Sequence, residues 1–378
     1  MDKDHSLDSL RGLACVLLVA YHVIGAQPDQ GLRVADGSYL RYMNESLLYI
    51  RMPLFTFLSG YVYALRPLQG DGVDFALKKL RRLLIPMMVV ATLYIIMQML
   101  VPGTNRSYSF MLLYTGHPVA HFWFLESLLL IFLVLIALEQ SGVLLTRAAF
   151  LLIFAGASLI SLLNVQPTLR FSINGAIYLA PYFLAGVAVH RFGFEHAGKA
   201  ARAALALLAL ACIGATQLGL SSLAEIDLGR QSPVGFAAGM TSVLALFLFR
   251  FRNQVLATIG AYAYTIYLFH VFGTAGTRIV LERLGLSNQE MHLALGIAAG
   301  IAAPIVLERL LERYDLPRLL LFGKSMRRRH AVPIASAGSG WAKMRARSLP
   351  ILAVRPRKTP LSPAGARAAL PDRSGGST

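Results

Sequence analysis

The sequence predicts an all-α fold: a polytopic membrane helix bundle of about ten transmembrane helices, with both termini cytoplasmic. Of its 378 residues, 56% are hydrophobic and only 15% are charged, whereas a soluble domain is about 45–50% apolar and about 25% charged. Apolar runs of about 20 residues, the length that crosses a bilayer, also recur along the whole chain. These observations exclude an ordinary cytosolic enzyme.

The apolar runs define the expected elements and their direction. They lie at residues 7–27, 47–65, 83–101, 122–138, 143–163, 173–189, 203–220, 234–249, 255–276 and 291–311. The first run follows the acidic leader MDKDHSLDSLR, so we interpret it as a retained span and not as a secretory signal. Lys and Arg are more frequent in loops after even-numbered runs than after odd-numbered ones, which predicts cytoplasmic termini in a cell inner (plasma) membrane.

The end of the chain differs in composition, which suggests two regions. We expect a transmembrane domain at residues 1–323 and a basic, disordered cytoplasmic tail at residues 324–378. From Arg318 onward there are thirteen Lys and Arg and one acidic residue, Asp372. Such a tail either lies near anionic lipid headgroups or is simply solvated. The two cysteines, Cys15 and Cys212, lie inside apolar runs and have no metal-type spacing, so we expect no metal and no redox chemistry. We also expect no nucleic-acid partner; oligomeric state leaves no signature in the sequence.

Ionisable residues at membrane depth are the first functional candidates, because their burial in lipid is costly. In the first run, Arg11 and His22 are eleven residues apart, which places them on one helix face and about 16 Å apart along the axis. They can therefore serve different parts of one groove. The alternatives are a histidine that is hydrogen-bonded within the bundle and an arginine that snorkels to the interface.

The second and third runs add cations and a small-residue pair. Arg51 lies at the expected outer edge of the second run, and Ser59-Gly60 would let another helix backbone approach closely. The segment DFALKKLRRLLIP concentrates basic residues before the third run, including Lys78, Arg81 and Arg82. This cluster either only enforces orientation or forms a phosphate cradle on the cytoplasmic side.

The fourth and ninth runs supply the remaining candidates. In HFWFLESLLL, His121 lies at the water boundary, while Trp123 and Glu126 share a helix face. An interfacial Trp or His can be an ordinary belt residue, but Glu126 needs a partner inside the membrane. By depth, that partner could be His22, Arg51 or His270. Tyr264 and Tyr267 lie with His270 in GAYAYTIYLFH and could be packing aromatics.

Together these segments resemble the acyltransferase-3 family of integral membrane O-acyltransferases. The resemblance covers about residues 7–317 and rests on an ordered set of motifs: LDSLRGLACVLLVAYH, PLFTFLSGY, KKLRRLLIP, HFWFL, PYFLAGVAV and IGAYAYTIYLFH. It implies an O-acyltransferase, of O-acetyltransferase type, that uses acyl-CoA, most simply acetyl-CoA, as co-substrate. The implied acceptor is a hydroxyl of a carbohydrate or glycolipid of the cell envelope.

The resemblance also suggests roles, because acyl transfer to a hydroxyl needs a base and positive charge for the oxyanion. His22 is the hypothesised general base or acyl relay, and Glu126 is expected to orient it. The catalytic set is His22, Arg11 and Glu126; the cofactor-binding set is Lys78, Arg81 and Arg82, with Arg11 beside it. The substrate-binding set is Arg51, His121, Trp123, Tyr264 and His270.

A different class of protein stays open on the sequence alone. A transporter or flippase for a glycolipid or polar solute would also place Arg, His and Glu inside a bundle. The basic cluster next to the Arg11–His22 face favours a phosphorylated donor instead, and the Gly/Pro-broken helix pairs typical of many transporters are not evident. A non-catalytic scaffold would leave Glu126 and His22 unexplained.

Overall fold

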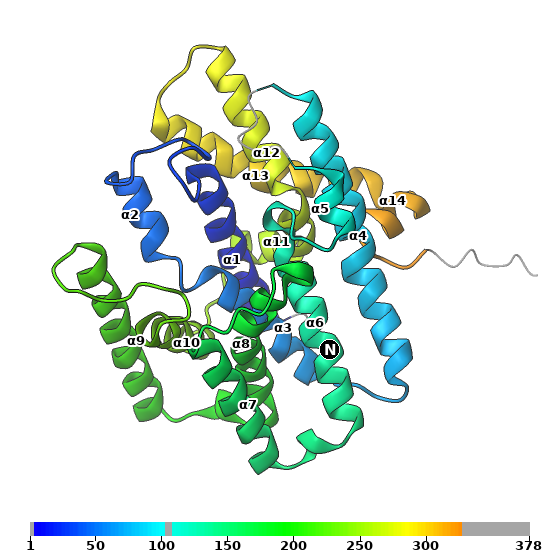
Figure 1. The fold of residues 1–378 in the computed structure, drawn as a ribbon, viewed down its shortest axis with the longest axis vertical. Coiled ribbons are helices and arrows are strands. Elements are labelled where there is room, and N and C mark those ends of the chain that lie inside the picture. Colours follow the sequence, from blue (N-terminus) through cyan, green and yellow to red (C-terminus); the bar gives the residue numbers. More distant parts are fainter. Residues whose placement is uncertain (1–3, 103–107, 327–378) are drawn as a thin grey trace, which may run out of the picture. The chain divides into compact units, whose positions relative to one another are not determined.

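A computed structural model describes residues 4–102 and 108–326, and all regular secondary structure in these ranges is helical. Every apolar run corresponds to a helix (Figure 1). These helices are α1 (His5–Ile24), α3 (Arg51–Leu65), α4 (Gly72–Leu100), α6 (Trp123–Gln140), α7 (Arg147–Leu162), α8 (Ile173–Arg191), α9 (Lys199–Leu220), α10 (Pro233–Leu248), α11 (Gln254–Ala261) with α12 (Ala263–Arg283), and α13 (Gln289–Leu311). The short helices α2 (Tyr39–Ser46), α5 (Phe110–Tyr114) and α14 (Asp315–Leu320), and 3-10 turns such as η1 (Ala120–Phe122) and η3 (Arg170–Ser172), were not expected.

The helix lengths support a multi-pass membrane protein. In the described residues, six helices are long and apolar enough to cross a membrane, and the bent pair α11–α12 makes up to seven. Helices α3, α7 and α10 have only 15 or 16 residues, fewer than the roughly 20 that a straight crossing needs. The all-helical class is confirmed, while the count of ten crossings and the orientation of the termini stay predictions.

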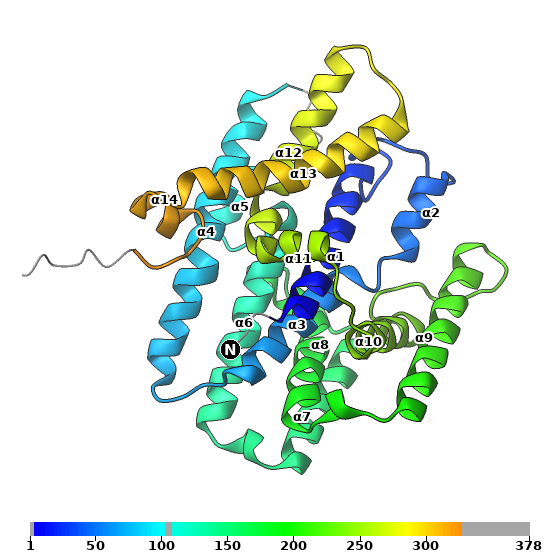
Figure 2. The same ribbon diagram turned by 180° about the vertical axis from the view of Figure 1, so that it is seen from behind.

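The ninth run is not one continuous helix, which corrects the expectation for residues 255–276. The chain bends by 85° between α11 and α12. The bend lays α11 along α1, where a Cβ on Gly12 would be 1.9 Å from the Leu256 carbonyl oxygen and one on Gly260 would be 1.8 Å from that of Asp8. Helix α13 packs beside both α12 and α1 (Figure 2).

Helices α3 and α8 also form a tight crossing. A Cβ on Gly60 would lie 2.0 Å from the Phe183 carbonyl oxygen, and one on Gly186 would lie 2.1 Å from that of Phe57. Only glycine permits this approach. The expected role of Gly60 is confirmed, whereas the Ser59 hydroxyl donates to the Phe55 carbonyl of its own helix.

Two helix starts explain charged residues near the ends of the apolar runs. The Asp4 carboxylate caps α1 by accepting from the Ser6 backbone N–H, 2.9 Å away. Partial burial acts against its charge, but the hydrogen bonds from Ser6 outweigh this and lower the pKa of Asp4. Asp71 caps α4 at Gly72, well before the predicted start at residue 83, so the basic cluster lies inside this helix.

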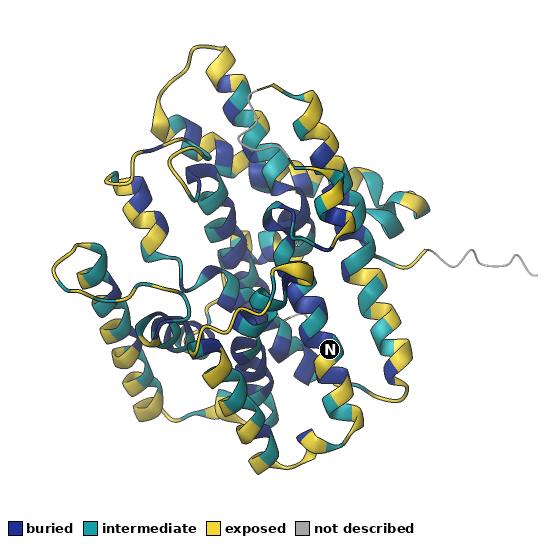
Figure 3. Cartoon of the chain, viewed as in Figure 1, coloured by how far each residue is buried: buried dark blue, intermediate teal, exposed yellow. Residues whose placement is uncertain are grey.

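Burial separates central helices from peripheral ones. In the apolar stretches of α1, α6 and α8, 61% of residues are buried, against 11% in α9. Helix α9 accordingly shows exposed residues along its length in Figure 3. Its exposed side chains include Leu207, Leu208 and Leu210, as expected of a helix that faces lipid.

The structure reaches only the first residues of the predicted tail; residues 327–378 lie outside the described residues. Lys324, which we assigned to the tail, is attached to α13: its Nζ is 2.5 Å from Glu308 Oε1 and 2.8 Å from Glu312 Oε2. Partial burial opposes the charge of Lys324, but the bonds to these carboxylates prevail and raise its pKa. Phe322 is also fully buried, so the chain packs against the helices beyond the end of α14 at Leu320.

Candidate active site

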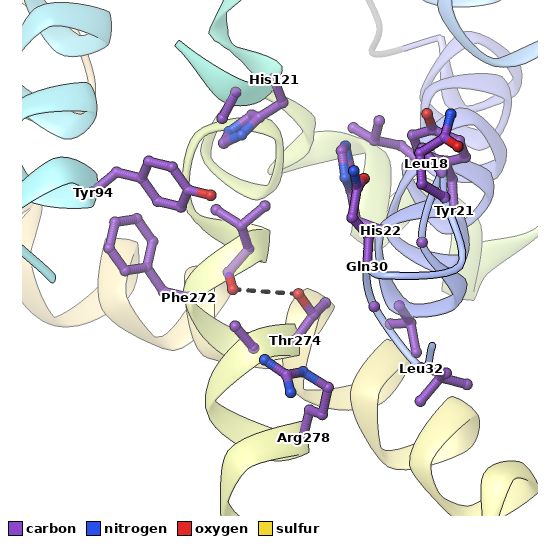
Figure 4. Close-up of a pocket in the computed structure, with 18 of the residues that line it drawn as sticks. Leu18, Tyr21, His22, Gln30, Leu32, Tyr94, His121, Phe272, Thr274 and Arg278 are labelled. Carbon is purple, nitrogen blue, oxygen red and sulfur yellow. Dashed lines mark hydrogen bonds between the residues drawn. The ribbon is translucent and has the colours of Figure 1, made fainter. Parts of the chain in front are cut away.

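A cavity of about 450 Å³ lies among the ends of several helices. It is lined by the C-terminal ends of α1 and α4, the N-terminal ends of α3, α6 and α13, and much of α12. Figure 4 shows the lining residues from α1, α4 and α12. In the predicted topology these are all outer ends. The volume falls in the range of small-molecule sites, about 300–1,000 Å³.

Three histidines from different helices meet beside this cavity. His22 and His121 line it, while His270 of α12 lies behind them and is fully buried. The ring centroids are 4.7 Å apart for His22 and His270, 4.9 Å for His121 and His270, and 5.8 Å for His22 and His121. The structure therefore brings together three sequence-predicted residues. Among the described residues, no group of three His, Cys, Asp or Glu is placed to hold a metal ion.

The hydrogen bonds of His270 define its role in the cluster. Its Nδ1 is 2.9 Å from the carbonyl oxygens of both Ile266 and Tyr267. Carbonyl oxygens only accept, so Nδ1 carries the proton and a neutral ring has an acceptor at Nε2. That Nε2 has no hydrogen-bond partner within the described chain, nor has either ring nitrogen of His121. Each buried nitrogen without a partner costs about 1–3 kcal/mol. Buried polar groups that are left unpaired in this way are typical of a functional site.

Arg51 supplies a buried positive charge to the cavity wall. Its Nη1 donates to Asn44 Oδ1 at 2.5 Å and its Nη2 donates to the Asn44 carbonyl at 2.8 Å. The guanidinium carbon lies 4.2 Å from the centroid of the Tyr21 ring. No carboxylate of the described chain forms an ion pair with it, so Arg51 is held by neutral groups next to the helix turn that carries His22.

Trp123, which we predicted to contact the acceptor, also lines the cavity. A Cβ on Gly175 of α8 would lie 2.8 Å from Trp123 Cε3, so this glycine lets the indole pack against α8. The Tyr267 hydroxyl donates to the His121 carbonyl and ties α12 to the turn before Trp123.

Glu126 does not make the expected contact with His22. Its carboxylate accepts from the Ser172 hydroxyl and it is absent from the cavity wall. Phe171 and Ser172 both have positive φ, 53° and 54°, and this turn returns the Ser172 side chain toward α6. Glu126 therefore faces the start of α8 and not α1.

The proposed donor-binding residues lie apart from the cavity. Arg11 Nη1 is 2.8 Å from Asp8 Oδ1. Lys78 and Arg81 are exposed on α4, and Lys78 Nζ is 3.9 Å from Asp74 Oδ2. These three residues lie in the N-terminal parts of α1 and α4, whereas the C-terminal ends of both helices line the cavity.

Arg82 and Tyr264 contact each other and the end of the described chain. Arg82 Nη1 donates to the Phe322 carbonyl at 3.1 Å, and its guanidinium carbon lies 4.8 Å from the Tyr264 ring centroid. The Tyr264 hydroxyl donates to the Arg82 carbonyl at 2.5 Å. Tyr264 does not line the cavity, so the structure places it beside Arg82 of the basic cluster and not with the other predicted substrate-binding residues.

Two arginines in the cavity wall, Arg230 and Arg278, were not among the residues predicted from the sequence. Arg278 lies eleven residues after Tyr267 on α12, the same interval as Arg11 to His22, so helical periodicity could have found it. Arg230 lies in the loop between α9 and α10, where no periodic pattern indicates direction.

One comparison with known proteins gives a match. The family model described as an acyltransferase domain matches residues 4–309, which contain all eleven candidate residues. No curated protein and no solved structure matches the chain.

Proposed function

Because the chain belongs to the acyltransferase-3 family, we propose that it is a membrane O-acyltransferase that moves an acyl group, most simply acetyl, from cytoplasmic acyl-CoA to a hydroxyl of a cell-envelope carbohydrate or glycolipid. The observation that carries the proposal is the position of His22, which lines a cavity of about 450 Å³. The family match favours this function over the transporter class.

His22 acts as the general base in this proposal. Its imidazole takes the proton of the acceptor hydroxyl as the oxygen attacks the thioester carbonyl. The new C–O bond forms, the C–S bond breaks, and the departing sulfur receives the proton from the imidazolium. General acid–base help of this kind is worth about 10²–10⁴-fold in rate.

His270 positions His22 for this step. Its Nδ1–H is committed to the Ile266 and Tyr267 carbonyls, so its Nε2 can accept an N–H from the adjacent imidazole of His22. That bond would leave the other nitrogen of His22 unprotonated and able to act as the base. The closeness of the two rings, 4.7 Å between centroids, supports this arrangement.

The remaining candidates divide between the two ends of the helices. Arg51, His121 and Trp123 shape the acceptor end, with the indole stacking on a sugar ring. Glu126 acts through Ser172, by holding the start of α6 against α8. At the other end, Arg11, Lys78, Arg81 and Arg82 bind the phosphates of acyl-CoA, since arginine forks pair with phosphate, while Tyr264 packs against Arg82.

The test is acetyl-CoA consumption by purified membranes that contain the wild type, His22→Ala or His196→Ala. His196 is an exposed histidine outside the cavity. We expect His22→Ala to lose about 10²–10⁴-fold in turnover at equal protein level, and His196→Ala to match the wild type. Turnover retained in His22→Ala would overturn the role. Mass spectrometry of envelope glycans and lipids, with and without the protein, would identify the acceptor by one added acyl group.

A further inference from the structure

The cavity wall has a strong imbalance of charge. Arg51, Arg230 and Arg278 all line it, and no Asp or Glu of the described residues does. Arg51 and Arg278 are only 4% and 6% exposed. Placing guanidinium groups in a poorly hydrated wall without carboxylates is costly, so the arrangement favours a ligand that brings negative charge.

The partners of each arginine support this interpretation. Arg51 is held by Asn44 and Tyr21, which are neutral. Arg230 forms no ion pair with any carboxylate in the described chain. Arg278 Nη1 is 2.9 Å from Glu282 Oε1, but Glu282 does not line the cavity. Even with that pair counted as neutral, two positive charges face the cavity.

Arg230 is held by an ordered loop. The Tyr49 hydroxyl, just before α3, donates to the Leu228 carbonyl at 2.8 Å, and the Gly229 N–H donates to Asp227 Oδ1 at 2.8 Å. A Cβ on Gly235 of α10 would lie 2.2 Å from the Gly229 carbonyl oxygen. The loop is thus fastened to both α3 and α10, and this fixes Arg230 in the wall.

This anion site is separate from the one proposed for the donor. On α4, Lys78 belongs to the basic cluster and Met97 lines the cavity. The two residues are nineteen positions apart, so the two sites are separated by about 28 Å at 1.5 Å per residue. A bilayer core is about 30 Å thick. Two cationic sites so far apart suit two different anionic molecules.

We propose that the cavity binds an acceptor with an anionic group, a phosphate or a carboxylate, which Arg51, Arg230 and Arg278 hold while a hydroxyl of the same molecule reaches His22. Guanidinium forks pair bidentately with either group. The name acceptor rests on the proposed function; the anion site itself does not.

The test measures binding, so it does not depend on acyl transfer. Thermal unfolding of the purified full-length protein in neutral detergent is followed with sodium pyrophosphate, sodium glucuronate or coenzyme A, at matched ionic strength. The variants are Arg230→Gln and, as matched control, Arg283→Gln, because Arg283 is exposed on α12 and outside the cavity. We expect pyrophosphate or glucuronate to stabilise the wild type and Arg283→Gln, with an apparent Kd about tenfold or more higher in Arg230→Gln.

The results distinguish the type of anion, the existence of the anion site and the proposed function. Stabilisation by pyrophosphate alone identifies a phosphate-bearing acceptor, and stabilisation by glucuronate alone a uronic-acid-type acceptor. If neither anion stabilises the protein in an Arg230-dependent way, the proposal is wrong. It is also wrong if the effect of coenzyme A requires Arg230, because the site would then belong to the donor. An Arg230-dependent anion effect in a protein that consumes no acetyl-CoA would preserve the anion site and overturn only the proposed function.

Discussion

At the scale of single residues, the site depends on imidazoles that the sequence does not connect. His22, His121 and His270 could each be selected because ionisable groups within apolar runs are costly. Their contact could not be derived, because they come from α1, η1 and α12, and no periodicity relates different helices. The partner of Glu126 could not be derived either. Its depth in the membrane made His22 a possible partner, but the turn at Phe171 and Ser172 brings the Ser172 hydroxyl to the Glu126 carboxylate instead.

The proposed positioning role of His270 leads to a prediction with His270→Asn. The Asn Nδ2 can still donate to the Ile266 carbonyl, but the shorter side chain places no acceptor at the position of Nε2. We expect kcat to fall by about 10²-fold or more with little change in either KM, because His22 would be held in the wrong tautomer. The pH–rate profile of the variant should also shift.

Steady-state kinetics of purified protein checks this prediction, with His196→Asn as the control. A purely structural role would lower the amount of active protein and leave the pH–rate profile of the remainder unchanged. An unchanged profile would therefore refute positioning by His270.

At the scale of elements, helix existence followed from the sequence better than helix ends did. Apolar runs located the helices because length and hydropathy decide membrane insertion. They did not show the bend between α11 and α12 at Tyr262, since no Pro and no Asp, Glu, Lys or Arg interrupts residues 255–276. They also missed the first part of α4, because the charged residues there lie inside a helix that begins at the Asp71 cap.

The α3–α8 crossing predicts that Gly60→Val destabilises the fold. The Phe183 carbonyl oxygen would lie 2.0 Å from the new Cβ, so the backbones must separate, at a cost of about 1–3 kcal/mol or more. Thermal unfolding in detergent should show a clearly lower Tm. Gly156→Val on α7 is the matched control, because nothing lies within 4 Å of its Cβ position. Equal Tm values for the two variants would contradict the tight crossing.

Variants in the basic part of α4 can separate a role in acyl-CoA binding from a role in the stability of the fold. Lys78 and Arg81 are exposed, so the double variant Lys78→Gln/Arg81→Gln should raise the KM for acyl-CoA severalfold at an unchanged Tm, through loss of charge-assisted contacts. Arg82→Gln should lower the Tm as well, because Arg82 also holds the Phe322 carbonyl. An unchanged KM in the double variant would leave the cluster with an orienting role only.

At the scale of the whole molecule, charge is divided between the two ends of the helices. The Lys78–Arg82 cluster lies at one end of α4 and the cavity with its three arginines at the other. The sequence indicated the first end through the distribution of Lys and Arg. It could not indicate the second, because Arg230 and Arg278 contribute to the outer loops only as scattered charges. The proposed mechanism requires that the first end face the cytoplasm and the second face outward.

This orientation can be tested with single cysteines in two exposed loops, Gln69→Cys between α3 and α4 and Ser287→Cys between α12 and α13. Cys15 is fully buried and Cys212 lies in an apolar helix, so the wild type should stay unlabelled by a membrane-impermeant maleimide and serves as the control. In intact spheroplasts we expect Ser287→Cys to react and Gln69→Cys to react only after permeabilisation, because the loops after even-numbered runs carry the larger share of Lys and Arg. The reverse pattern would place the cavity in the cytoplasm and reverse the assignment of donor and acceptor ends. Labelling of both cysteines from outside would mean that the two loops share one side of the membrane, and no transfer across the bilayer could then connect the two sites.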